Sequence, residues 1–205
     1  DIGSWNVSSG NNFFQMFYEA YAFNQDIGSW NVSSGTNFNW MFSGADAFNQ
    51  DIRSWDVGSG TDFSYMFAGA DAFEQYISNW QVSDTARLTN MFDLADLMTS
   101  NRGFSSTPTS ADFNKTPITD RSSLDTAITA WIEDEAAATA TYGDINTWDV
   151  RAITDFSELF KNKKTFNSDI SNWDVSSGTN FRAMFYGADA FNQDIGSWDV
   201  GSGTD

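Results

Sequence analysis

The chain has 205 residues, of which 10 are basic and 28 acidic, so its formal charge is −18. Phosphate backbones and anionic membrane surfaces repel such a chain, so we predict no nucleic-acid partner. No apolar run is long enough to span a bilayer, and we also predict no membrane insertion. Because Cys and His are absent, disulfides, thiolate metal sites and His-based catalytic triads are excluded.

A 25-residue repeat occupies residues 1–98. Its most regular part is the motif I-x-x-W-x-V, whose tryptophans Trp5, Trp30, Trp55 and Trp80 recur at one constant interval. This is the spacing of the strand in leucine-rich repeats, and the alternation puts Trp and Val on one face. We therefore predict one short strand in each repeat, with its Ile, Trp and Val in the core.

After the strand motif, each repeat changes its period. A Gly in the intervening turn, such as Gly35, indicates either a positive φ or a close backbone approach. Apolar residues then recur at helical spacing, as in Phe38, Met41, Phe42 and Ala45. The predicted fold class is an α/β solenoid resembling leucine-rich repeats, with one short strand and one short helix per repeat, since such repeats bury their apolar faces by stacking.

The period breaks in the middle of the chain. Residues 1–98 are predicted to be the end of one solenoid of about four repeats, and residues 99–118, which contain both prolines, a Ser/Thr/Pro linker. Residues 119–147 are predicted to form a helical cap, which opens at Ser122 and carries the apolar stripe Leu124, Ile128, Trp131 and Ile132. The repeat restarts at 148–205, predicted as the start of a second solenoid that is cut within a repeat.

These motifs resemble the BspA-like family of bacterial surface proteins, which has leucine-rich-like repeats of this length. The resemblance rests on FNQDI-x-SWDVSS, on Trp-x-Val, on the Met-Phe pair and on Gly-Ala-x-x-Phe-Asn-Gln, and residues 116–150 are similar to the family's amino-terminal cap. Gly35 and Phe38 depart from the family's usual Val and Met. The resemblance implies an extracellular or cell-surface location and a role in adhesion.

The two ends of the chain lie within the repeat, since residues 194–205 match residues 51–62 almost letter for letter. Solenoids usually carry polar terminal caps, and uncapped ends would expose Trp, Ile and Val. We therefore expect copies of the chain to associate with one another end to end.

Aspartates in consecutive repeats form the candidate metal site. Asp149, Asp174 and Asp199 lie between Trp and Val, facing away from the predicted core at a spacing of about 5 Å. Like charges at this distance repel, and Ca²⁺ could bridge them. The alternative interpretation is a solvated acidic surface, and the sequence leaves both open.

Two further candidate sites are polar. The outward-facing residues of the predicted strands form a candidate ligand face for glycans or host proteins, made of Ser29, Asn31, Ser54, Asp56, Asn172 and Asp174. Asn114 lies in an Asn-x-Thr sequon within the predicted linker, which makes it a candidate for N-glycosylation in a eukaryotic source.

Two functions remain open from the sequence. The leading hypothesis is a non-enzymatic extracellular structural protein that forms filaments or cell-surface fibres by self-association. The alternative is an adhesion or recognition module that binds glycans or host proteins through the polar face. We predict no enzyme activity, because the repeat accounts for every pair of carboxylates and singles out none.

Overall fold

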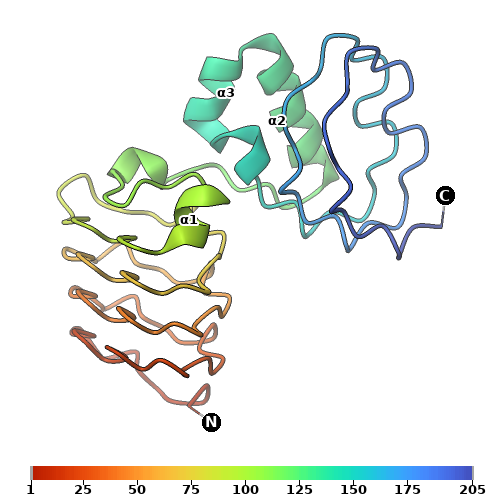
Figure 1. Cartoon of the computed structure of the whole chain (residues 1–205). Helices are drawn as coiled ribbons and strands as arrows, with labels where there is room; N and C mark the ends of the chain where they lie inside the picture. Colours follow the sequence, from red (N-terminus) through yellow and green to blue (C-terminus); the bar gives the residue numbers. More distant parts are fainter. Residues whose placement is uncertain (1, 205) are drawn as a thin grey trace. The chain divides into compact units, whose positions relative to one another are not determined.

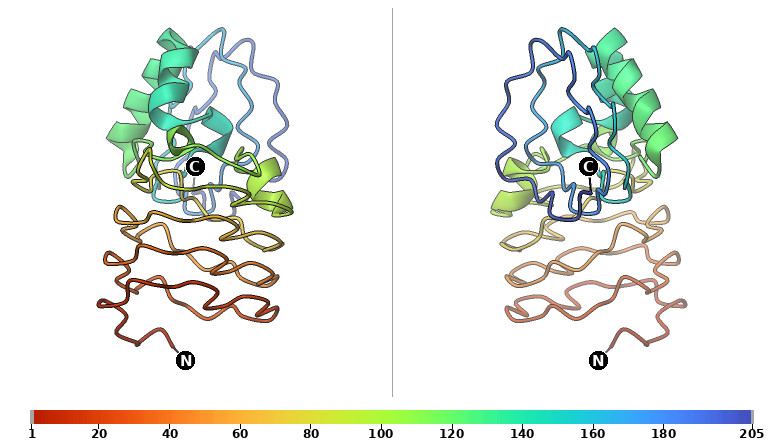
Figure 2. Two further views of the ribbon diagram at one scale, coloured as in Figure 1. Left: turned by 90° about the vertical axis from the view of Figure 1, so that its left-hand side faces the viewer. Right: turned by 90° about the vertical axis from the view of Figure 1, so that its right-hand side faces the viewer.

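The computed structural model describes residues 2–204. The chain divides into two compact units, Asp1–Lys115 (unit 1) and Thr116–Asp205 (unit 2). Within each unit, flat coils stack on one another, one coil for each sequence repeat, as Figures 1 and 2 show for unit 1. The helices of the described residues are α1 (Asp96–Ser100), η1 (Ser110–Asp112), α2 (Arg121–Glu133), α3 (Glu135–Tyr142) and η2 (Ile145–Thr147).

The prediction of an α/β solenoid with a strand in each repeat is wrong. In the described residues, β-pairing between coils is limited to isolated parallel bridges, such as Asn37↔Asp62. The Ile-x-x-Trp motif closes a turn instead, because the N–H of Trp30 donates to the carbonyl of Ile27 at 3.0 Å. A second turn follows at once, from the N–H of Gly35 to the carbonyl of Val32. Backbone groups used within turns cannot form a ladder, so no sheet results.

The predicted short helix of each repeat is also wrong. Met41 and Ala45 donate their N–H groups to carbonyls three residues back, whereas Phe42 donates to Met66 in the next coil. Trp40 and Gly44 have positive φ angles of 58° and 69°, which end each helical turn. Successive turns of this kind place every third or fourth side chain inside the coil, which reproduces the helical spacing of the sequence. Each coil is therefore a chain of turns.

We call residues 26–37 and their equivalents the Trp half-coil, and residues 38–50 and their equivalents the Phe half-coil. In both units the inner side chains of neighbouring coils stack in register, with Phe42 and Phe67 5.5 Å apart and Trp55 and Trp80 6.4 Å apart between ring centroids. Most inner indole N–H groups also cross to a neighbouring coil, as when Trp55 Nε1 donates to the Ile27 carbonyl, whereas Trp148 Nε1 donates to Gly143. The predicted core columns of Ile, Trp and Val are thus confirmed in the interior coils.

The turn glycines make a close approach rather than adopting a positive φ. A methyl group on Gly60 would overlap the buried ring of Phe63 and lie 3.0 Å from the carbonyl oxygen of Val57. Gly35 meets the ring of Phe38 in the same way. The absence of a side chain at this position lets the ring of the following Phe fill the corner of the coil.

Residues 101–115 cover the last coil of unit 1, although they fall in the segment predicted as a linker. Phe104 and Phe113 are buried and pack in series on Phe92, with ring centroids 5.0 and 5.1 Å apart. The N–H of Phe92 donates to the Ser106 carbonyl, whereas the equivalent N–H of Phe67 donates to a carbonyl of the next coil. This segment therefore replaces a following coil.

Helices α2 and α3 cover the first coil of unit 2, as Figure 1 shows. From the predicted stripe, Leu124, Ile128 and Trp131 are buried, and Trp131 meets Trp148 edge to face, whereas Ile132 is exposed. The helix does not open at Ser122 as predicted. Its N-cap is Asp120, whose carboxylate accepts the N–H of Ser123 at 2.7 Å.

The coil geometry predicts opposite outcomes for two glycines in one turn. Gly60→Ala should destabilise unit 1 by about 1–3 kcal/mol, because the new methyl overpacks the corner filled by Phe63. Gly58→Ala is the matched control, because the nearest atom to its methyl is the flexible Asp56 carboxylate at 3.3 Å, and it should change stability by less than about 0.5 kcal/mol. Urea unfolding of both variants measures the difference, and equal losses would contradict the proposed packing.

Candidate interaction surfaces

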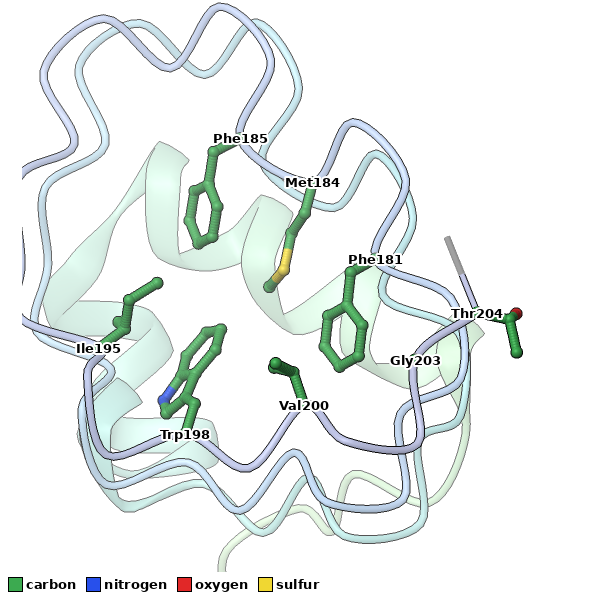
Figure 3. Close-up of a pocket in the computed structure, with 8 residues that line it drawn as sticks. All are labelled: Phe181, Met184, Phe185, Ile195, Trp198, Val200, Gly203 and Thr204. Carbon is green, nitrogen blue, oxygen red and sulfur yellow. The ribbon is translucent and has the colours of Figure 1, made fainter.

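The coil at residues 181–204 has an open apolar face. Figure 3 shows the side chains of Phe181, Met184, Phe185, Ile195, Trp198 and Val200 pointing toward one common space, whereas Thr204 lies outside it. They surround a hollow of about 550 Å³. Val200 is 50% exposed, whereas Val57 and Val175, at the same position in covered coils, are 1% exposed. The face therefore has the side chains of a coil interior without a covering coil among the described residues.

The first coil of unit 1 also has exposed inner side chains, on the side that faces away from the second coil. Trp5 is 53% exposed and Met16 is 38% exposed, whereas Trp30 and Met41 in the next coil are 3% and 0% exposed. Trp5 stacks on Trp30 on one side only, with ring centroids 6.4 Å apart.

The structure does not assemble the predicted calcium ligands into a metal site. Asp149 is paired with Arg151 at 2.9 Å, and Asp174 and Asp199 each accept a backbone N–H two residues further on, from Ser176 and Gly201. Across residues 2–204, no group of three or more acidic side chains is arranged to hold a metal ion. Each carboxylate instead closes its own turn, so the calcium hypothesis gains no support.

The predicted ligand face is divided between the two units, with Ser29, Asn31, Ser54 and Asp56 in unit 1 and Asn172 and Asp174 in unit 2. Most of its polar groups already serve the coils. The hydroxyls of Ser29 and Ser54 donate to the carbonyls of Gly3 and Gly28 in the preceding coil. The side chains of Asn31 and Asp56 accept N–H groups from Ser33 and Gly58.

Asn114 holds the segment that covers unit 1. Its side-chain amide accepts the N–H of Val82 at 2.9 Å and donates to the Val82 carbonyl at 3.1 Å, and it also donates to Ser110. One side chain thus takes the place of a neighbouring backbone. N-glycosylation at Asn114 stays a prediction, and it would take one of the two amide hydrogens used here.

The carboxylate of Asp155 helps to attach α2 to the first coil of unit 2. Hydrogen bonds from the Ser157 hydroxyl and backbone N–H, together with the nearby Arg121 on α2, lower the pKa of Asp155. Because the folded-state pKa is lowered, ionised Asp155 stabilises the unit above the ordinary Asp pKa. This contribution is lost as the pH falls through the lowered value.

The residues of the open face were not among the candidate sites derived from the sequence, although exposure of Trp, Ile and Val had been expected. The alignment of the repeats could have identified these residues as inward-facing. Phe181, Phe185 and Trp198 occupy the same repeat positions as the core residues Phe38, Phe42 and Trp55. A repeat position that is apolar in every repeat shows which side chains point inward, but it does not show which coil is covered by a neighbouring coil.

These features define a repeat protein built from stacked, turn-based coils, in which the exposed inner faces of coils are the most distinct surfaces. The sequence profile of the family described as "Mycoplasma protein of unknown function, DUF285" matches residues 1–104 and 126–205, so the chain belongs to this family. Searches of curated proteins and of solved structures found no match. In the described part of the chain, no helix has the length and apolar character needed to cross a membrane.

Substitutions at Asn114 test how the covering segment is held. Asn114 has a φ of 59°, so Asn114→Gly keeps the backbone conformation and removes only the side-chain bonds, at an expected cost of about 1–3 kcal/mol to unit 1. Asn114→Ala should cost about 1 kcal/mol more, because a Cβ is strained at this φ. Thermal unfolding of the two variants separates these contributions, and a Gly variant as stable as the parent would show that the two bonds to Val82 contribute little.

Proposed function

We propose that the protein is a non-enzymatic structural repeat protein of the bacterial cell surface, whose copies associate end to end through their coil faces into filaments or surface fibres. Membership of a bacterial repeat family supports the general class. The finer assignment, to BspA-like surface proteins, rests on the resemblance of FNQDI-x-SWDV and the Met-Phe pair. The proposal includes no catalytic step and no cofactor.

The observation that carries the proposal is the open face at residues 181–204. Within unit 1, successive coils bury the equivalent side chains against one another, and nearly all of them are below 5% exposed in the interior coils. Apolar surface left in water favours association by about 25 cal/mol for each Å² that becomes buried. A face that already has the shape of a coil interface favours a partner with the shape of a coil.

Adhesion through the polar face has a weaker basis. Recognition of a glycan or a host protein requires free hydrogen-bonding groups, and the hydroxyls of Ser29 and Ser54 already bond to neighbouring coils. No observation favours this alternative over self-association.

A charge placed in the open face tests the proposal. Trp198→Asp should abolish concentration-dependent association, because the carboxylate would have to be buried among Phe185 and Ile195. Tyr186→Asp is the matched control, since Tyr186 lies in the same coil but is 67% exposed and does not line the hollow.

Multi-angle light scattering over a range of concentrations measures both variants against the parent. Association of the parent and of the Tyr186 variant, but not of the Trp198 variant, is the expected result. A parent chain that stays monomeric at every concentration would refute end-to-end association.

A further inference from the structure

We propose that the outer side of the Phe half-coils in unit 1 binds the outer side of the Phe half-coils in unit 2 of a second copy, so that copies associate side by side. This inference goes beyond the end-to-end association proposed above and does not depend on it, because it concerns the sides of the coils and not their stacking faces. The surface on unit 1, called the acidic face, consists of Trp40, Asp46, Tyr65 and Asp71. The surface on unit 2, called the basic face, consists of Lys161, Lys163, Lys164 and Arg182.

The Phe half-coils of the two units differ in charge. In unit 1 they contain five acidic residues and no basic residue, counted over residues 13–23, 38–48, 63–73 and 88–98. In unit 2 they contain four basic and two acidic residues, counted over residues 156–166 and 181–191. The Phe half-coils of unit 2 thus carry a net positive charge in a chain whose total charge is −18.

The opposite charges stand at equivalent positions of the repeat. Lys164 of unit 2 occupies the position that Asp46 and Asp71 occupy in unit 1. The backbone is also equivalent there, because the N–H of Ala190 donates to the Lys164 carbonyl as the N–H of Ala72 donates to the Asp46 carbonyl. Both units therefore present this position on the same side of the coil, with charges of opposite sign.

The two carboxylates of the acidic face are not used within the fold. The carboxylates of Asp26 and Asp51 in the Trp half-coils accept backbone N–H groups, whereas Asp46 and Asp71 have no hydrogen-bond or ion-pair partner among the described residues. Both are exposed, and they lie in adjacent coils about 5 Å apart. Like charges at this spacing repel each other, so a cation placed against both of them is favourable.

Two aromatic residues complete the acidic face. Trp40 and Tyr65 are partly exposed and stack on each other, with ring centroids 4.3 Å apart. Their φ angles are 58° and 57°, which strain a residue with a Cβ, although Gly44 and Gly69 occupy another positive-φ position of the same half-coils. Lys and Arg pack their aliphatic stems on apolar surface while the charged head reaches a polar partner. Rings beside free carboxylates therefore suit basic side chains.

The basic face can exchange its present partners for these carboxylates. Lys161 and Arg182 share Glu158, and Lys164 lies 3.7 Å from Asp189. The side chains of Lys164 and Arg182 are 72% and 65% exposed, and ion pairs as exposed as these contribute little. The bases outnumber the acids around them, so this side of unit 2 still favours an acidic partner.

The composition of the chain favours a second copy as that partner. The chain has only ten basic residues, and four of them lie in the basic face. Complementary charges fix which surfaces meet and speed their encounter. Because every copy carries one face of each sign, side-by-side contact needs no other protein and can continue from copy to copy.

Charge reversal on each face, followed by mixing, tests this contact. The acid-reversed variant carries Asp46→Lys and Asp71→Lys, and the base-reversed variant carries Lys161→Asp and Lys164→Asp. Each change introduces a residue that the other unit has at the equivalent position, since Asp93 of unit 1 corresponds to Lys161. Both variants should therefore fold, which circular dichroism checks.

Each variant alone should associate side by side at least about tenfold more weakly than the parent, because like charges then face each other. An equimolar mixture places the lysines of one variant against the aspartates of the other and should recover the loss. Sedimentation velocity in about 0.15 M salt measures the gain of the mixture over the mean of the separate solutions, and about 1 M salt should remove it. End-to-end association contributes equally to both sides of this comparison, because the substitutions lie outside the stacking faces.

The matched control for the acid-reversed variant carries Asp26→Lys and Asp56→Lys. It makes the same change in charge at exposed positions of the Trp half-coils, so it should give no gain when mixed with the base-reversed variant. Attraction between whole chains cannot produce the gain, because the parent charge is −18 and each pair of substitutions changes it by four.

A gain with the acid-reversed variant but not with the control is the expected result. An equal gain with both would show that overall charge drives the association, and it would overturn the proposal. No gain in either mixture would overturn it as well and leave the two faces to other partners. End-to-end association is judged separately, by the Trp198→Asp variant.

Discussion

The structure depends on the sharing of backbone hydrogen bonds between neighbouring coils. Within each Phe half-coil, successive turns use about every second N–H group, and most of the groups between them donate to the next coil. Buried backbone groups without partners cost free energy, so a coil is stable only beside another coil or a substitute for one. Residues 101–115 and the helices α2 and α3 are such substitutes, and the open face at residues 181–204 is a place where none is present among the described residues.

The sequence predicted the period and the inner side chains correctly but not the backbone conformation. The Ile, Trp and Val columns are buried as expected, because a strict repeat of apolar residues leaves few alternatives. Phe38, Met41 and Phe42 follow helical spacing, and a chain of short turns gives the same spacing. The positive φ of Trp40 distinguishes the two, and a bulky aromatic residue gives no sign in the sequence that it adopts that angle.

Departures from the repeat could have revealed where unit 1 is covered. Glu74 and Tyr76 stand where other coils have Asn and Asp, and both contact Arg102 of the covering segment, through an ion pair at 3.2 Å and a ring contact at 3.7 Å. A change of residue type at two nearby repeat positions thus indicates that this coil packs against a segment that is not another repeat. The part played by Asn114 could not have been found in this way, since its partner Val82 is distant in the sequence and follows the repeat normally.

The direction of the bonds between coils has an electrostatic consequence for the length of a stack. In the Phe half-coil most N–H groups that leave the coil donate forward, as from Phe42 to Met66, whereas in the Trp half-coil they donate backward, as from Thr61 to Thr36. Their dipoles therefore partly cancel, unlike those of an α-helix, which add along its axis. A longer stack accumulates little macrodipole, and its terminal coils need no charges of a particular sign to compensate one. The hydrogen-bond dipoles thus add little electrostatic cost as coils are added, and the surface carboxylates are left as the main source of repulsion.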